Sequence, residues 1–237
     1  MKIAVIGAMR EEIEFLLPHM ENLREERKLK TTFYVGSFSG KELVVVQSGV
    51  GKVASGILFS ALMHAHPDTQ LAINTGVAGG VPGKVEIGEV VVADRVAYAD
   101  VDITAGGKYV YGELPGYPRF LPSGSELFRK VSLPHKIGTI LTGDKFFSEP
   151  EDIEPLLEGP YRNENVLAFD MESAAFAQSA LFYGVPFVSV RAISDIIGIK
   201  GQLQDFEDNL ERAALNSNRM LLEALIHLEI GKTFYIF

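Results

Sequence analysis

The stretch LAFDMESAAFAQSALFYGVPFVSVRAISD, residues 167–195, decides the fold of this chain. It predicts a short apolar strand, an acidic turn, an apolar helix, a Gly-Val-Pro break and a second apolar strand. Two carboxylates, Glu172 and Asp195, stand at the ends of these otherwise apolar elements. Acids displayed at the tips of a buried scaffold indicate acid–base chemistry on a small polar molecule.

Strands and helices alternate along most of the remaining chain. Further strands are expected at 2–6, 33–38, 42–47, 71–74, 88–93 and 136–142, and further helices at 11–20, 53–65, 125–131 and 206–230. Strands 33–38 and 42–47 flank a Ser-Gly-Lys turn and predict a hairpin. We therefore predict a three-layer α/β/α sandwich with a mixed, mainly parallel central sheet. Residues 1–232 are expected to form one domain, and the apolar tail 233–237, TFYIF, receives no role.

The composition is that of an ordinary globular protein, with 237 residues, 47% hydrophobic residues and a net charge of -9. No basic patch is present, so neither nucleic acid nor an anionic membrane is an expected partner. No apolar run approaches the roughly 20 residues that span a bilayer. The chain has no cysteine and no signal-peptide pattern at its start, and we expect a cytoplasmic protein.

Three glycine-rich turns follow apolar runs: GAM at 7–9, SGVGK at 48–52 and TGVAGG at 75–80. Glycine lets a ligand approach the backbone closely, and ligands of open α/β sheets bind beyond the carboxyl ends of strands. A tight turn alone also requires glycine, so each turn has a structural explanation as well. None has the spacing of a dinucleotide fingerprint or a P-loop.

The acids are the only convincing catalytic groups. Glu12 and Glu172 each stand where a carboxylate would stabilise a helix N-terminus, which is a structural explanation for both. Asp195 ends an apolar strand, where a charge needs a partner or a ligand. The five histidines have no metal-ligand spacing, and GxSxG and HExxH motifs are absent from the sequence. We therefore expect neither a metal nor a cofactor.

Eight segments together carry a family resemblance. They are MKIAVIGAMREE (1–12), SGVGKVA (48–54), INTGVAGG (73–80), GEVVVAD (88–94), LPGYP (114–118), TGDKFF (142–147), DMESA (170–174) and VPFVSVRAISD (185–195). In this order they resemble the bacterial 5'-methylthioadenosine/S-adenosylhomocysteine nucleosidases of the nucleoside phosphorylase/nucleosidase superfamily. The resemblance implies a phosphorylase/hydrolase-like fold without cofactors. It also implies hydrolysis of the adenine N-glycosidic bond of these nucleosides and of 5'-deoxyadenosine, in methionine salvage.

Carried over residue by residue, the resemblance assigns roles to the acids. Asp195 is implied as the general acid that protonates adenine N7, with Ser194 orienting it. Glu12 is implied to hold and activate water, and Glu172 to bind the ribose hydroxyls. The other implied substrate residues are Met171 at the sugar, Phe146 and Phe147 at adenine, Met9, Val50 and Phe206 around the ribose and alkylthio group, and Ala78, Gly79, Asp170 and Arg191. The loop from Tyr109 to Pro115 resembles a segment that enters a neighbouring subunit's site, which implies a homodimer.

The sequence departs from the family pattern in places. Val77 stands where some relatives have Ser, Asp170 replaces a commoner Glu, and loops 100–113 and 196–206 carry small insertions. A phosphorylase of the same fold is one alternative, although its Gly-Asp-Pro first turn with an Arg is absent. An aminofutalosine-type nucleosidase and a non-catalytic nucleoside-binding domain are others. The intact set of Glu12, Glu172 and Asp195 argues against the last.

Overall fold

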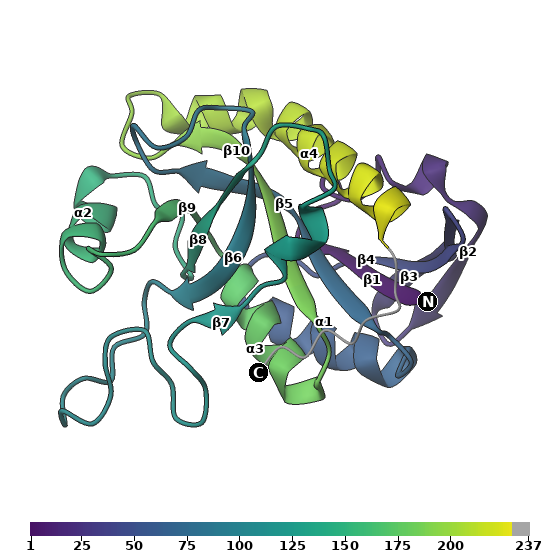
Figure 1. Cartoon of the computed structure of the whole chain (residues 1–237), viewed down its shortest axis with the longest axis horizontal. Coiled ribbons are helices and arrows are strands. Elements are labelled where there is room, and N and C mark those ends of the chain that lie inside the picture. Colours follow the sequence, from purple (N-terminus) through teal and green to yellow (C-terminus); the bar gives the residue numbers. More distant parts are fainter. Residues whose placement is uncertain (229–237) are drawn as a thin grey trace.

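The computed structural model describes residues 1–228 and contains one ten-stranded sheet with helices on both faces (Figure 1). The strands are β1 (Lys2–Gly7), β2 (Glu21–Lys28), β3 (Thr31–Phe38), β4 (Lys41–Gln47), β5 (Leu71–Gly80), β6 (Val90–Tyr98), β7 (Leu121–Pro122), β8 (Lys136–Thr142), β9 (Val166–Asp170) and β10 (Phe187–Ile196). The helices are α1 (Lys52–Ala65), α2 (Pro150–Glu158), α3 (Ser173–Tyr183) and α4 (Gln202–His227), with short 3-10 turns at Leu17–His19 and Ser125–Phe128. The tail 233–237 lies outside the described residues.

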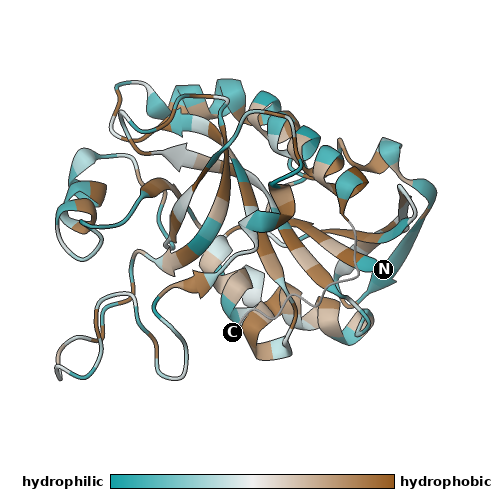
Figure 2. Ribbon diagram, in the orientation of Figure 1, coloured by the Kyte–Doolittle hydropathy of each residue, from teal (hydrophilic) through white to brown (hydrophobic). Residues whose placement is uncertain are grey.

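The predicted three-layer α/β/α arrangement is confirmed. Helices α1 and α3 pack side by side on one face of the sheet, and α4 runs along the other (Figure 1). Phe59 of α1 and Phe176 of α3 are fully buried in the first layer, and Ala214 and Leu221 of α4 are fully buried in the second. The hydrophobic strands between these layers stand out in Figure 2. Among the described residues, no helix is long and apolar enough to cross a membrane.

The sheet is mixed, as predicted, but it also closes on itself. Parallel pairings join β4 to β1, β1 to β5, β5 to β10, β6 to β8 and β8 to β9, while β2 and β3 are antiparallel to their neighbours. Strand β10 is antiparallel to β6, and Gly79 and Gly80 at the end of β5 pair with β9. Strands β5, β10, β6, β8 and β9 therefore form a ring. A register shift between Ile193 and Asp195 supplies the local bend that such closure needs.

The predicted helix at 11–20 is wrong. The segment forms turns followed by the 3-10 turn Leu17–His19. Ile13 and Leu16, whose spacing favoured a helix, are buried as expected. However, the side chain of Glu12 points inward and accepts hydrogen bonds from the backbone N–H groups of Ala8 and Met9. These local hydrogen bonds, together with a tertiary one from the Val77 N–H, compete with the helical pattern.

The predicted strand at 71–74 is too short, because β5 continues through the glycine-rich motif to Gly80. The predicted helix at 125–131 is only the four-residue 3-10 turn Ser125–Phe128. Both differences lengthen or shorten predicted elements without changing the layers. The longer β5 matters for the site, because its last residues form part of the wall described next.

Candidate active site

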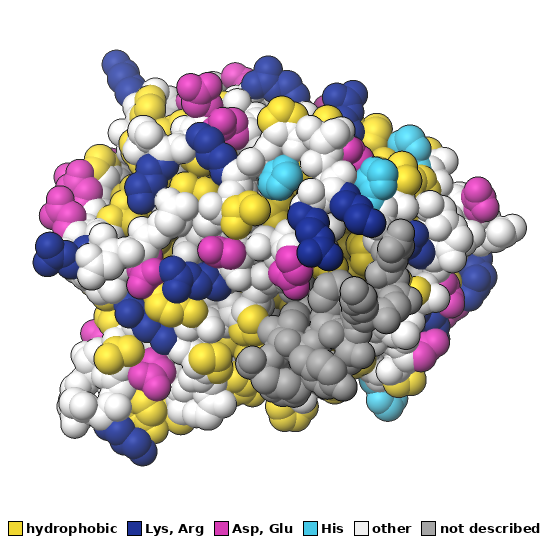
Figure 3. Space-filling model, viewed as in Figure 1, with side chains coloured by type: hydrophobic (Ala, Val, Ile, Leu, Met, Phe, Trp, Pro, Cys, Tyr) yellow, Lys and Arg dark blue, Asp and Glu magenta, His cyan; other side chains and the backbone are white. Residues whose placement is uncertain are grey.

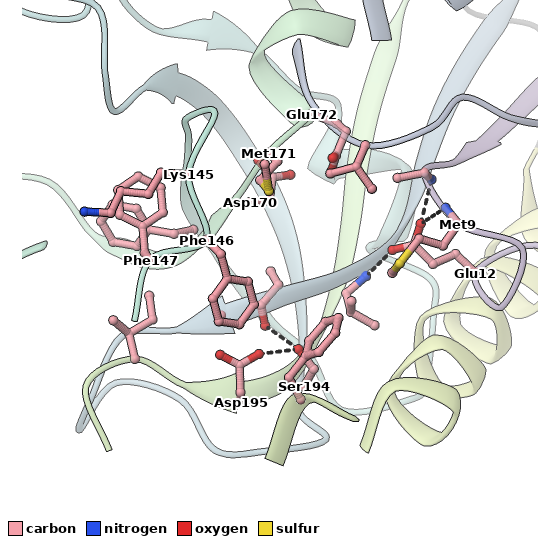
Figure 4. Close-up of a pocket in the computed structure, with 18 residues that line it drawn as sticks. Met9, Glu12, Lys145, Phe146, Phe147, Asp170, Met171, Glu172, Ser194 and Asp195 are labelled. Carbon is pink, nitrogen blue, oxygen red and sulfur yellow. Dashed lines mark hydrogen bonds between the residues drawn. The ribbon is translucent and has the colours of Figure 1, made fainter. Parts of the chain in front are cut away.

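A cavity lies where the carboxyl ends of β1, β5, β9 and β10 meet (Figure 4). It contains about 670 Å³ of empty space when the solvent at its open mouth is included. Most of the predicted site residues line it: Met9, Glu12, Val50, Ala78, Gly79, Phe146, Phe147, Asp170, Met171, Glu172, Ser194, Asp195 and Phe206. The fold thus brings together side chains that are up to 197 residues apart in the sequence (206 − 9).

The predicted site residues and the residues that line the cavity are not identical sets. Arg191 was predicted as a substrate residue, but it lies buried behind the wall rather than in it. Tyr109 and Pro115 do not line the cavity; they belong to the segment between β6 and β7, which projects from the body (Figure 1). Val77, noted above as a departure from the family pattern, also lines the cavity, as do four residues that were not predicted: Ala8, Lys145, Phe169 and Ile197.

Glu12 is almost completely buried, with 1% of its surface exposed. Its Oε2 accepts the backbone N–H groups of Ala8 (2.6 Å) and Met9 (2.9 Å), and its Oε1 accepts the N–H of Val77 (2.9 Å). A Cβ at Gly76 would lie 2.2 Å from Oε1, so only glycine fits there. Burial raises the pKa of Glu12, and Arg191 together with the three N–H groups opposes that rise.

Arg191 on β10 is fully buried and faces three carboxylates. Its Nη2 lies 2.7 Å from Asp170 Oδ2 and 3.3 Å from Glu172 Oε2, and its Nη1 lies 3.8 Å from Glu12 Oε1. Nη2 also donates to Asn74 Oδ1 (2.5 Å). Among the described residues, Nη1 has no hydrogen-bond acceptor, although it is buried. A buried donor without an acceptor in the protein is available to a water or a ligand.

Glu172 precedes α3 and is also buried. Its Oε1 accepts the N–H of Gly51 (3.0 Å) in the turn before α1, and its Oε2 accepts from Arg191 (3.3 Å). Burial raises the pKa of Glu172 to about 7, against the opposing charge of Arg191 and helped by Asp170 and Glu12. Glu172 can therefore exchange a proton near neutral pH.

Asp195 stands away from this cluster, at the other side of the cavity (Figure 4). It is 1% exposed, and its Oδ1 accepts from Ser194 Oγ (2.5 Å). Its Oδ2 accepts from Gln202 Nε2 (2.7 Å). Burial raises the pKa of Asp195, and these two hydrogen bonds oppose the rise. Asp195 has no ion-pair partner among the described residues, unlike Glu12 and Glu172.

Aromatic rings form the apolar part of the wall. Phe147 packs against Phe169, with ring centroids 4.8 Å apart. Phe146 is 41% exposed at the mouth and meets the edge of Phe206, with centroids 5.5 Å apart. A flat ring system can lie against such side chains while its polar edge faces Asp195. The cavity thus offers stacking surfaces, one isolated acid and one group of acids around a cation.

Comparisons with known proteins agree with this geometry. A model of the phosphorylase superfamily matches residues 2–226. The 5'-methylthioadenosine/S-adenosylhomocysteine nucleosidase of Halalkalibacterium halodurans is 36% identical over 228 residues, covering 93% of this chain and 96% of the relative.

Solved structures give the same result. The S-adenosylhomocysteine nucleosidase of Streptococcus pyogenes, in complex with 5-methylthiotubericidin, superposes with a TM-score of 0.90 at 38% identity, covering 97% of this chain and 98% of that one. The MTA/SAH nucleosidase of Streptococcus pneumoniae, in complex with 8-aminoadenine, superposes with a TM-score of 0.89 at 35% identity, covering 96% and 100%. The chain therefore belongs to the phosphorylase superfamily and, within it, to the 5'-methylthioadenosine/S-adenosylhomocysteine nucleosidases.

Proposed function

We propose that this protein hydrolyses the N-glycosidic bond of 5'-methylthioadenosine and S-adenosylhomocysteine, and of 5'-deoxyadenosine, releasing adenine and the 5-substituted ribose. Its relatives are named nucleosidases of the first two compounds, and the solved neighbours bind adenine-like ligands. The bond is hard to break because adenine is a poor leaving group and the sugar becomes cationic. A hydrolase therefore needs an acid at the base, a water at the sugar and negative charge near the cation.

Asp195 is the proposed general acid. It is buried, and burial favours the protonated form that a general acid must hold. Ser194 donates a hydrogen bond to Oδ1 and so holds the Asp195 carboxyl group in place at the cavity wall. Phe146 and Phe147 hold the base, one ring by stacking and the Phe147 backbone at the base edge. Protonation of adenine N7 by Asp195 then turns the base into a neutral leaving group.

Glu12 and Arg191 are the proposed water site. The carboxylate of Glu12 is fixed by three backbone N–H groups. The Nη1 of Arg191, which has no hydrogen-bond acceptor within residues 1–228, lies 3.8 Å from Glu12 Oε1. A water between these groups would donate to Glu12 and accept from Arg191. Glu12 takes a proton from this water as the water attacks the sugar carbon. Its raised pKa makes it a stronger base than an exposed carboxylate.

Glu172 and Met171 are proposed to bind the ribose, with Glu172 accepting hydrogen bonds from its hydroxyl groups. Met9, Val50 and Phe206 line the remaining apolar wall and suit an alkylthio group. Ala78, Gly79 and Asp170 complete the wall. Asp170 also holds Arg191 through Nε (2.9 Å), so its main contribution is to place the guanidinium.

The observation that best supports hydrolysis over phosphorolysis is that a carboxylate of the protein occupies the turn after β1. Backbone N–H groups after a strand are a ready-made anion site. Here the carboxylate of Glu12 already accepts those of Ala8 and Met9. A phosphate at this position would lose the N–H donors and face a buried carboxylate at close range. The protein thus supplies its own anion where a phosphorylase would need to bind one.

The decisive experiment measures adenine release from 5'-methylthioadenosine with and without phosphate. Hydrolysis predicts a rate that is independent of phosphate and free 5-methylthioribose as the sugar product. A rate that follows phosphate, with sugar 1-phosphate formed, would show phosphorolysis instead. A panel of 5'-substituted adenosines, including aminofutalosine, tests the 5' preference in the same assay.

We further infer a homodimer built on α1 and its neighbours. Val53 and Ile57 of α1 are 73% and 68% exposed, and Val50 at the mouth of the cavity is 53% exposed. The projecting segment exposes Ile103 and Val110, and apolar side chains are visible at the lower left of Figure 3. A second copy on this face would cover these side chains. Its Tyr109–Pro115 loop could then complete the open side of the cavity.

A further inference from the structure

Gln202, the first residue of α4, makes contacts that the mechanism above does not use. Its side chain is buried, and its Nε2 bridges Asp195 Oδ2 (2.7 Å) and the backbone oxygen of Phe147 (2.8 Å). Its Oε1 accepts the N–H of Gly198 (2.8 Å). One planar NH₂ group therefore donates both its protons to the two acceptors at the base end of the cavity.

An adenine bound for protonation presents the same chemistry. The edge of adenine that carries the N7 acceptor also carries the 6-amino group, a planar NH₂ with two protons. If Asp195 faces N7, the 6-amino group lies beside the same carboxylate. The Phe147 carbonyl is the neighbouring acceptor. The amide of Gln202 thus occupies the donor role that the 6-amino group of the substrate would fill.

The contact with Gln202 also opposes the protonation of Asp195 that burial favours. Both its oxygens accept hydrogen bonds, one from Ser194 and one from Gln202, and two donors stabilise the carboxylate over the acid. An acid that gives a proton to N7 must first be protonated, and Gln202 must leave before adenine can face Asp195. Departure of the Gln202 amide removes one of the two donors that oppose protonation of Asp195.

We propose that Gln202 is a specificity-determining residue whose amide stands in for the 6-amino group of adenine and is displaced by it. This proposal rests on the proposed function, because it takes adenine as the base. Purines with a 6-amino group can replace both hydrogen bonds that Gln202 gives up. A purine without the 6-amino group must either bind with Gln202 still in place or displace Gln202 and leave the two buried acceptors, Asp195 Oδ2 and the Phe147 carbonyl, without donors. The second outcome is costly.

The displaced side chain has somewhere to go. An open groove on the outer side is lined by Gln202 itself together with Phe146, Ser148 and Gly198. Phe146 lines both this groove and the cavity, so the two spaces meet at that ring. Rotation of the Gln202 side chain into the groove would return its amide to water.

The test compares adenine and unsubstituted purine binding to the wild-type protein and to Gln202→Ala, by isothermal titration calorimetry. We expect Gln202→Ala to bind adenine roughly tenfold more tightly, because about one net hydrogen bond no longer has to be broken. Purine affinity should not rise, since Gln202 can remain beside a base that lacks the amine. Gln202→Met, which keeps the side-chain length without a donor, should behave as Gln202→Ala does and guards against a folding defect in either.

Gln204→Ala is the matched control, because Gln204 lies on the same helix, donates to Asp208 and lines the outer groove but not the cavity. Unchanged or weaker adenine binding in both Gln202 variants would overturn the proposal and make Gln202 a support for Asp195. An equal gain for adenine and purine would also overturn it, because that gain would be steric. If the wild-type protein binds no adenine, the proposed function itself fails.

Discussion

Replacing Asp195 by Asn should stop catalysis and leave the fold intact. The two side chains have the same shape, and the hydrogen-bond partners of Asp195 can adapt. The hydroxyl of Ser194 can turn toward the carbonyl of Ala78, which is 3.3 Å away, and accept from the new amide. Gln202 Nε2, at 2.7 Å, can continue to donate to the remaining oxygen. The variant therefore keeps every buried partner of Asp195 satisfied.

The expected change in stability of Asp195→Asn is small, whereas the expected change in its rate is large. Two charge-assisted hydrogen bonds become neutral ones, while a buried charge disappears, so we expect a stability change of about 1 kcal/mol or less. For a chain of this size that corresponds to a shift in Tm of roughly 2–4 °C. A positioned general acid contributes about 10²- to 10⁴-fold in rate, or roughly 3–5 kcal/mol of the barrier. The amide has no acidic proton, so kcat should fall by that factor.

The assay follows adenine release from 5'-methylthioadenosine across pH, with thermal unfolding measured on the same samples. Wild-type turnover should decline as pH rises through the pKa of Asp195, because the acid must be protonated. The residual activity of Asp195→Asn should lack that decline. Asp208→Asn, an exposed carboxylate on α4, is the control and should match the wild type. Near-native adenine release by a folded Asp195→Asn would refute the assignment of the general acid.

Three further predictions follow from the same geometry. Glu12→Gln should lower kcat at least ~100-fold with adenine affinity unchanged, because an amide cannot take a proton from water; weakened adenine binding with normal kcat would contradict this. Burial raises the pKa of Glu172 from its ordinary 4.5 to about 7, so the native state holds more protons than the unfolded state in that window. Stability in urea should therefore fall as pH rises from 4.5 to 7, and Glu172→Gln should weaken that fall. Ile57→Asp should convert dimer to monomer in light scattering, whereas Leu29→Asp, at an 81% exposed site, should not.

Elements with strong local signals were predicted well. Strand β8 has the predicted bounds 136–142, and the hairpin of β3 and β4 is as expected, because continuous apolar runs flank a turn there. Helix α2 was missed. Its sequence, PEDIEPLLE, is acidic and carries Pro155 inside the helix, so neither periodicity nor propensity favours it. A capping box between Glu149 and Asp152, with Pro150 at the start, defines the helix instead.

The candidate site could be predicted only as far as its motifs reach. Met9, Phe146 and Met171 stand in short segments that resemble the family, and their positions follow from those segments. Gln202 stands in a segment, 196–206, that was expected to be a loop and carries no family motif, whereas the structure begins α4 at Gln202. Its contact with Phe147 spans 55 residues and depends on how α4 meets the loop after β8. A local sequence pattern cannot predict a contact between residues this far apart in the chain.

The charge around Arg191 connects the fold to the proposed chemistry. One guanidinium faces the carboxylates of Glu12, Asp170 and Glu172, all buried, so full ionisation would leave an excess of negative charge away from water. Such an excess is costly: burial raises the pKa of both Glu12 and Glu172, and the neighbouring carboxylates Asp170 and Glu12 raise that of Glu172 further. A sugar that becomes cationic beside this cluster relieves the excess, whereas the neutral substrate does not. In the proposed mechanism the site is therefore more complementary to the cationic transition state than to the neutral substrate, which is the condition for catalysis.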